Sequence, residues 1–157
     1  SHLLAAIGEA GFRRLRDQML AALESAPVDR PRERHAQLGT AYVHFAIENP
    51  GYFRVMFRPE LVDHTEFPDL EASGDETYGV LVAHIEDLQA RGNIPPGDPE
   101  KWSLVCWSIV HGLATLILDG PLGDARRKAE HIPDESIAET VMRTMAGVLV
   151  DELSPDG

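Results

Sequence analysis

A histidine within an otherwise apolar stretch is the residue of this sequence best suited to chemistry. His111 lies in the apolar run 102–118, and Trp107 stands one helical turn before it. A neutral imidazole donates and accepts hydrogen bonds and can transfer protons near neutral pH. His111 is therefore either a polar contact for a ligand or a core histidine bonded to a neighbouring group. Paired with Tyr42 or Tyr78, it would suit a small helical enzyme.

The remaining histidines do not have the spacing of metal ligands. They are spread through expected loops and helix flanks, at His35, His64, His84 and His131. His44 falls opposite Tyr42 on a helical wheel, so we expect it to be solvated. Neither HxxxH nor HExxH occurs, and these spacings are the ones that place two ligands on one helical face. We therefore expect no metal site.

Other catalytic signatures are absent from the sequence as well. It has no Gly-rich phosphate loop and no GxSxG turn, and Cys106 lies where a thiolate would be costly to form. Four neighbouring carboxylates are predicted to be a solvated loop surface: Asp69, Glu71, Asp75 and Glu76. We predict neither an enzyme nor a cofactor.

Length and composition favour a single domain over residues 1–157. The 26 acidic and 14 basic residues give a formal net charge of −12. Such a chain repels phosphate, so it is poorly suited to bind nucleic acid or an anionic membrane by itself. The single cysteine and the lack of an uninterrupted apolar run of membrane-spanning length favour a cytoplasmic protein.

Helical periodicity dominates, and no segment alternates as a strand would. The pattern predicts an all-α bundle of about six helices, over 3–24, 31–49, 52–57, 75–91, 98–119 and 134–153. Pro59, Pro68 and Gly74 predict an irregular connection over 58–74, and 121–133 is expected to be a polar loop. Gly8 and Gly11 lie on the apolar side of the first helix, which indicates a close neighbour or a cavity there.

The helix over 98–119 has apolar side chains on two opposite sides, so both sides must be covered. Either the final helix of the same chain covers the second side, or a symmetry mate does, as in a homodimer. Gly112 would permit a close approach of another helix. The predicted dimer contacts are Trp102, Val105, Ile109, Gly112, Leu113, Leu116, Ile137, Val141, Met145, Val148 and Leu149.

Aromatic, methionine and aliphatic side chains on several expected helices have the mixture typical of a small-molecule pocket. The same side chains at helical spacing would equally suit a plain core. The candidate ligand contacts are Phe12, Leu15, Met19, Tyr42, Phe45, Phe53, Met56, Phe57, Tyr78, Val82, Ile85, Trp107 and His111.

Three motifs give the sequence a family resemblance: AYVHFA at 41–46, NPGYFRVMF at 49–57 and WSIVHGLA at 107–114. With these motifs the chain resembles the C-terminal domain of TetR-like transcriptional regulators, in the subgroup with a Trp–His–Gly helix. The resemblance implies a homodimer formed by the last two helices, a small-molecule effector, and DNA binding through a separate N-terminal helix-turn-helix domain. Because the chain begins within a helix, we expect that domain to have been removed.

The sequence thus predicts the effector-sensing and dimerisation domain of a regulator, most often a repressor in this family, released from DNA by a hydrophobic or amphipathic ligand. A helical adaptor that binds another protein through the same apolar surfaces, with no ligand, is the alternative.

Overall fold

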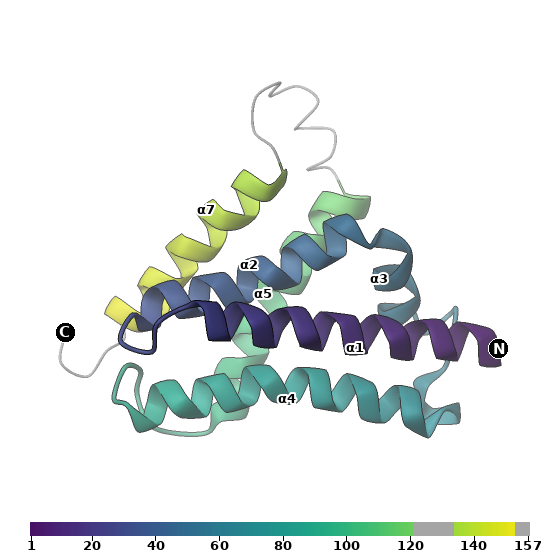
Figure 1. Cartoon of the computed structure of the whole chain (residues 1–157), viewed down its shortest axis with the longest axis horizontal. Coiled ribbons are helices and arrows are strands. Elements are labelled where there is room, and N and C mark those ends of the chain that lie inside the picture. The colour runs from purple at the N-terminus through teal and green to yellow at the C-terminus, as the bar shows by residue number, and fades with distance from the viewer. Residues whose placement is uncertain (121–133, 153–157) are drawn as a thin grey trace.

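The computed structural model describes residues 1–120 and 134–152, and it is helical throughout (Figure 1). The helices are α1 (His2–Ser25), α2 (Pro31–Glu48), α3 (Pro50–Phe57), α4 (Pro68–Ala90), α5 (Pro99–Asp119) and α7 (Asp134–Gly147), with short turns η1 (His64–Glu66) and η2 (Val148–Glu152). No strand occurs in these residues, so the prediction of an all-α fold of about six helices is confirmed. The loop predicted over 121–133 lies outside the described residues.

Proline begins four of the helices and fixes where they start. Pro31, Pro50, Pro68 and Pro99 each occupy the first helical turn. At this position the missing N–H costs nothing, and the fixed backbone angle suits the helix. Asp98 also caps α5, because its side chain accepts a hydrogen bond of 3.0 Å from the Glu100 backbone N–H.

The expected irregular connection over 58–74 is wrong in its second half. Helix α4 begins at Pro68, seven residues earlier than predicted, and η1 precedes it. Pro68 starts the helix rather than breaking it, and Gly74 lies within the helix. A Cβ atom at Gly74 would stand 3.6 Å from the Phe12 ring, so the glycine lies against α1. The two residues that suggested a loop are therefore a helix start and a helix-contact position.

Helices α1 and α4 lie side by side and run in the same direction (Figure 1). At Gly8 a Cβ atom would come within 2.8 Å of Leu70 on α4, and at Gly11 within 2.6 Å of the Met56 sulfur on α3. These distances are shorter than van der Waals contact, so a side chain at either position would require Leu70 or Met56 to move. The expectation of a close neighbour on this side of the first helix is confirmed.

Helix α5 buries one stripe against the rest of the chain and exposes another. The buried stripe consists of Ser103, Cys106, Val110, Leu113, Ala114 and Ile117. The opposite stripe, Val105, Ile109, Gly112 and Leu116, is called the outer face of α5 here. Val105 is 50% exposed and Leu116 47% exposed, while Ile109 and Gly112 are half-buried. Because α7 packs mainly on α2, it does not cover this outer face among the described residues.

By length and mean hydropathy alone, α5 is long and apolar enough to cross a membrane. Of its most apolar 18-residue window, 33% is buried inside the protein. Its buried stripe packs against α2 and α4, as expected for a core helix of a globular domain. Leu104, Val105 and Leu116 of the same helix remain exposed.

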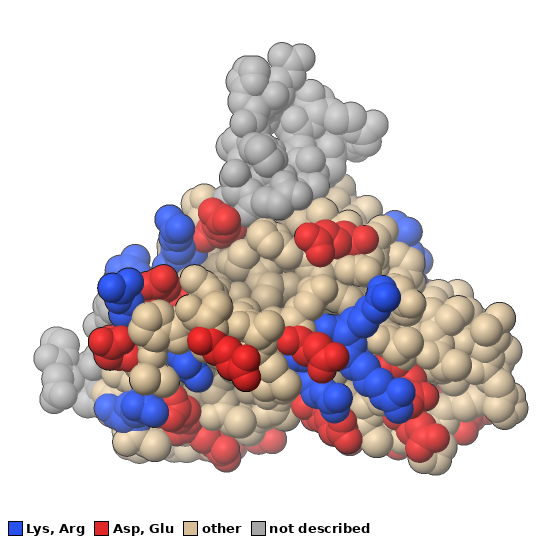
Figure 2. Space-filling model, viewed as in Figure 1, with Lys and Arg blue, Asp and Glu red and all other residues tan. Residues whose placement is uncertain are grey.

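Ion pairs between helices fix their relative positions. Arg16 on α1 pairs with Glu76 on α4. Arg54 and Arg58 donate to the two carboxylate oxygens of Asp119, over 3.0 Å and 2.9 Å, and join α3 to the end of α5. These hydrogen bonds, that of Arg54 foremost, lower the pKa of Asp119. On the face in Figure 2, Lys and Arg side chains lie among the more numerous Asp and Glu side chains.

Candidate functional site

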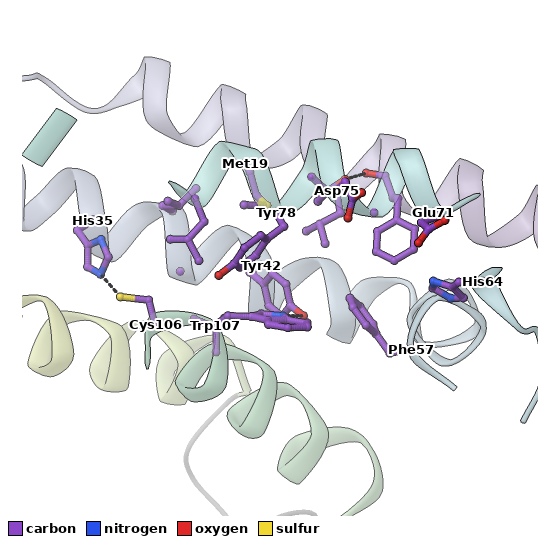
Figure 3. Close-up of a pocket in the computed structure, with 18 of the residues that line it drawn as sticks. Met19, His35, Tyr42, Phe57, His64, Glu71, Asp75, Tyr78, Cys106 and Trp107 are labelled. Carbon is purple, nitrogen blue, oxygen red and sulfur yellow. Dashed lines mark hydrogen bonds between the residues drawn. The ribbon is translucent and has the colours of Figure 1, made fainter. Parts of the chain in front are cut away.

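A cavity of about 380 Å³ lies where α1, α2, α4 and α5 meet, with α3, η1 and α7 each adding one residue (Figure 3). It is lined by Phe12, Leu15, Met19, His35, Leu38, Gly39, Tyr42, Phe57, His64, Glu71, Gly74, Asp75, Thr77, Tyr78, Leu81, Cys106, Trp107, Val110 and Met145. A concave site of this size, mainly apolar with a few polar groups, is typical of small-molecule binding.

Seven of the thirteen predicted ligand contacts line this cavity: Phe12, Leu15, Met19, Tyr42, Phe57, Tyr78 and Trp107. The other six, Phe45, Phe53, Met56, Val82, Ile85 and His111, are not in its wall. Phe45, Met56 and Ile85 are fully buried in the core, and Phe53 is buried against Phe57 and His111. These four side chains therefore lie where the plain-core interpretation expects them, outside the cavity wall. Ligand contact by the seven wall residues remains a prediction.

Tyr42 joins the indole of Trp107 to His111 through hydrogen bonds. Trp107 Nε1–H donates to the Tyr42 oxygen over 3.2 Å, and the Tyr42 oxygen lies 2.8 Å from Nδ1 of His111. An indole is a donor only, so Tyr42 accepts from it and has its own hydrogen free to donate to Nδ1. Desolvation lowers the pKa of His111, which favours the neutral imidazole that can accept.

His111 therefore acts behind the cavity wall and not in it. Its ring packs against Phe53, with centroids 5.3 Å apart, and against Phe57, with centroids 4.7 Å apart. Burial, the largest cause, raises the pKa of Tyr42 well above its ordinary value, so its phenol stays protonated. This arrangement holds the Tyr42 ring in place and corresponds to the predicted core histidine bonded to a neighbouring side chain.

Two histidines expected in loops or helix flanks form a buried pair instead. His35 on α2 and His84 on α4 are stacked, with Nε2 of His84 3.1 Å from Nδ1 of His35. Nε2 of His35 lies 3.7 Å from the sulfur of Cys106. Desolvation, the main cause, lowers the pKa of His35 to about 3 and that of His84 to about 4. Both imidazoles are therefore neutral at physiological pH.

Cys106 lies beside His35 at one end of the cavity (Figure 3). Burial raises the pKa of its thiol to about 12, so the thiolate expected to be costly is indeed disfavoured. The predicted solvation of His44 is also only partly right. This side chain is half-buried, and its Nε2 atom is inaccessible and has no hydrogen-bond partner in the described structure.

The carboxylates assigned to a solvated loop surface belong to helix α4. Glu71 and Asp75 stand one turn apart and line the cavity at the end opposite Cys106, near His64 (Figure 3). The sequence does not reveal their wall position, because Pro68 and Gly74 predict a loop there and a loop has no common helical face. Five further lining residues were not predicted. Leu38, Leu81 and Val110 have the spacing of ordinary core residues, and Gly39 and Gly74 have no side chain from which a contact could be predicted.

Within the described residues, no group of three or more His, Cys, Asp or Glu side chains could hold a metal ion. His84, His35 and Cys106 form a linear chain of hydrogen-bond contacts, and Nδ1 of His84 at its end is buried without a partner among the described residues.

The predicted dimer contacts fall into two groups in the structure. Val105, Leu116 and Val148 are exposed, and Trp102, Ile109, Gly112, Ile137, Val141 and Met145 are partly exposed. Leu113 and Leu149 are buried in the chain's own core. A Cβ atom at Gly112 would meet nothing within 4 Å, so space for a close approach remains open.

Comparison with known proteins gives this fold a family. No curated protein matches the chain. A solved structure of a protein with unknown function from Rhodococcus sp. RHA1 is 27% identical, with a TM-score of 0.74, over 95% of this chain and 72% of that one. Residues 35–149 match the family described as "Tetracyclin repressor-like, C-terminal domain". This match includes most of α2 and all of α3, α4, α5 and α7, and the chain thus belongs to the tetracyclin repressor-like C-terminal domain family.

Proposed function

We propose that this domain senses a small hydrophobic or amphipathic effector for a one-component transcriptional regulator. The observation that carries the proposal is the 380 Å³ cavity, because four helices of a family of repressor-like domains converge on it. Its wall combines aromatic faces, Met19 and Met145, and a few polar groups, as ligand pockets do. The sensing domain has no enzymatic role and acts in the cytoplasm.

The domain works as a homodimer in this proposal. The exposed apolar stripe on the outer face of α5 supports a two-fold contact, which needs only one self-complementary surface. Gly112 gives the partner helix room to approach, and the exposed Val148 extends the apolar surface at the end of α7.

DNA contact belongs to a helix-turn-helix domain outside the residues described here. In the dimer, two recognition helices would enter successive major grooves roughly 34–36 Å apart. An effector that favours a different spacing releases the repressor, and it must favour the released form by several kcal/mol to free most of the protein. Movement of α1 against α4 is the route we propose, since both helices line the cavity.

Native mass spectrometry of the domain, purified without added ligand, tests this proposal. We expect a dimer, and a fraction carrying a small-molecule mass that is lost at higher collision energy. A monomer at micromolar concentration would favour the adaptor alternative, in which the outer face of α5 binds a different protein. Enzymatic turnover of a released small molecule would contradict the sensing role.

A further inference from the structure

The polar groups of the cavity wall differ in whether they already have a hydrogen-bond partner within the described residues. The Tyr42 hydroxyl and the Trp107 indole are engaged in the chain that ends at His111. The Tyr78 hydroxyl donates to Glu100 over 3.2 Å, and the Thr77 hydroxyl lies within hydrogen-bond distance of the backbone oxygens of Phe12 and Ser73, at 3.1 and 2.7 Å. The aromatic and hydroxyl donors of the wall are thus already committed.

The acceptors at one end of the cavity are free by comparison. Glu71 and Asp75 are exposed, and neither side chain forms a hydrogen bond or ion pair within the described residues. Their neighbour Glu76, in contrast, pairs with Arg16. Like charges four residues apart destabilise a helix, and a cation between them would relieve that repulsion.

The formal charges of the wall all have one sign. The lining contains no Lys or Arg, and its two carboxylates are Glu71 and Asp75. His35 is held neutral by burial, which lowers its pKa to about 3. The His64 imidazole is the ring donor of this wall with no hydrogen bond within the described residues, and it lies at the same end as the two carboxylates. A carboxylate or phosphate ligand placed there would meet Glu71 and Asp75 as like charges and would lose hydration that one imidazole N–H replaces only in part.

Resting on the proposed function, we propose that the ligand of this cavity is a hydrophobic cation, such as an alkylammonium or a protonated aromatic amine. Its charged group lies at Glu71 and Asp75, and its apolar part extends toward Cys106. Tyr42, Tyr78 and Trp107 lie between these two ends (Figure 3). Their hydroxyl and N–H groups are used elsewhere, so their rings border the apolar part of the ligand.

Three probes with the same decyl chain and different head groups test this assignment: decyltrimethylammonium (cationic), decyldimethylamine oxide (without net charge) and decyl sulfate (anionic). Binding is measured by titration calorimetry at pH 8, where an unperturbed imidazole is neutral, and below each micelle concentration. We expect the cation to bind about fivefold to tenfold more tightly than the amine oxide, and the anion to bind most weakly.

The double variant Glu71→Gln/Asp75→Asn should bring the cation to the affinity of the amine oxide and leave the amine oxide unchanged. Glu86→Gln removes an exposed carboxylate of the same helix outside the cavity and should change neither. Equal affinity of wild type for the cation and the amine oxide would overturn the charge assignment and leave the pocket intact. Failure of all three probes to bind would overturn the proposed pocket as well.

Discussion

At the scale of single residues, hydrogen bonds set the orientation of Tyr42 in the cavity wall. Tyr42 accepts from Trp107 and lies within hydrogen-bond distance of His111, so its ring orientation is set from two sides. The sequence predicts all three residues as candidate ligand contacts, because aromatic and imidazole groups on apolar helix faces are typical of a pocket. It could not show that His111 stands behind Tyr42, because that depends on how α2 and α5 pack.

Replacing Tyr42 by Phe should destabilise the domain. The ring would remain, but the half-buried Trp107 N–H would lose its acceptor, and we expect a loss of about 1–3 kcal/mol in the free energy of unfolding. Urea denaturation followed by circular dichroism measures this loss. Tyr52→Phe is the control, since the Tyr52 hydroxyl has no hydrogen bond within the described structure, and its effect should be close to zero. Equal stability of both variants would contradict the role given to the Tyr42 hydroxyl.

The buried pair of His35 and His84 should make the fold sensitive to acid. Their folded-state pKa values, about 3 and about 4, lie below the ordinary value of 6.5. The unfolded chain therefore binds protons first as the pH falls below 6.5, and stability is lost from there downward. Between pH 6.5 and 5 we expect a loss of about 2 kcal/mol for each histidine, and no contribution above pH 6.5.

Denaturation midpoints over this pH range check the expectation, with His84→Gln as the comparison. The variant starts from a lower stability, but its dependence on pH should be about half as steep. A variant as sensitive to acid as wild type would assign the acid sensitivity to other groups.

At the scale of elements, α5 carries both the cavity and the exposed apolar stripe. The sequence predicted that this helix has more apolar surface than one neighbour can cover. Helical-wheel positions group Leu113 with Val105 and Leu116, whereas in the structure Leu113 is buried and the other two are exposed. A wheel gives angles around one helix and says nothing of the angle at which the next helix crosses it.

Leu116→Glu should disrupt the proposed dimer. Two-fold symmetry places the substitution twice in one interface, where each carboxylate would lose its hydration, so we expect the dimer dissociation constant to rise about 100-fold. Analytical ultracentrifugation measures the change. Leu20→Glu on α1 is the matched control, because Leu20 is 42% exposed against 47% for Leu116. Equal effects of the two substitutions would exclude the outer face of α5 as the interface.

At the scale of the whole molecule, ligand binding and stability are linked through the cavity. A ligand that binds only the folded protein stabilises it by about 2.7 kcal/mol at one hundred times its dissociation constant. For a domain of this size, we expect decyldimethylamine oxide at that excess to raise Tm by roughly 5–10 °C. Differential scanning calorimetry measures the shift.

Leu81→Trp fills the cavity from α4 and should abolish this shift, whereas Ala83→Trp, at an exposed position of the same helix, should retain it. An undiminished shift in Leu81→Trp would place the ligand elsewhere on the molecule.

Most of the architecture could be predicted from periodicity, because each helix repeats its apolar residues at the helical spacing. The polar end of the cavity could not be predicted in this way. Pro68 and Gly74 are residue types that are common in loops. The helix continues through Gly74 because this glycine packs against Phe12, a contact that only the structure shows. Glu71 and Asp75 depend on that helix to reach the cavity, so they were predicted to be a solvated surface.

The two tryptophans of α5 lie in different surroundings, and this makes the domain its own optical reporter. Trp107 lines the cavity and donates to Tyr42, whereas Trp102 is half-buried and does not line it. Indole emission responds to local polarity, so Trp102→Phe leaves a fluorophore that responds to occupancy of the cavity. Trp107→Phe leaves one positioned to respond to association of the subunits. The intrinsic fluorescence of a 157-residue chain can thereby separate its two proposed activities without an attached dye.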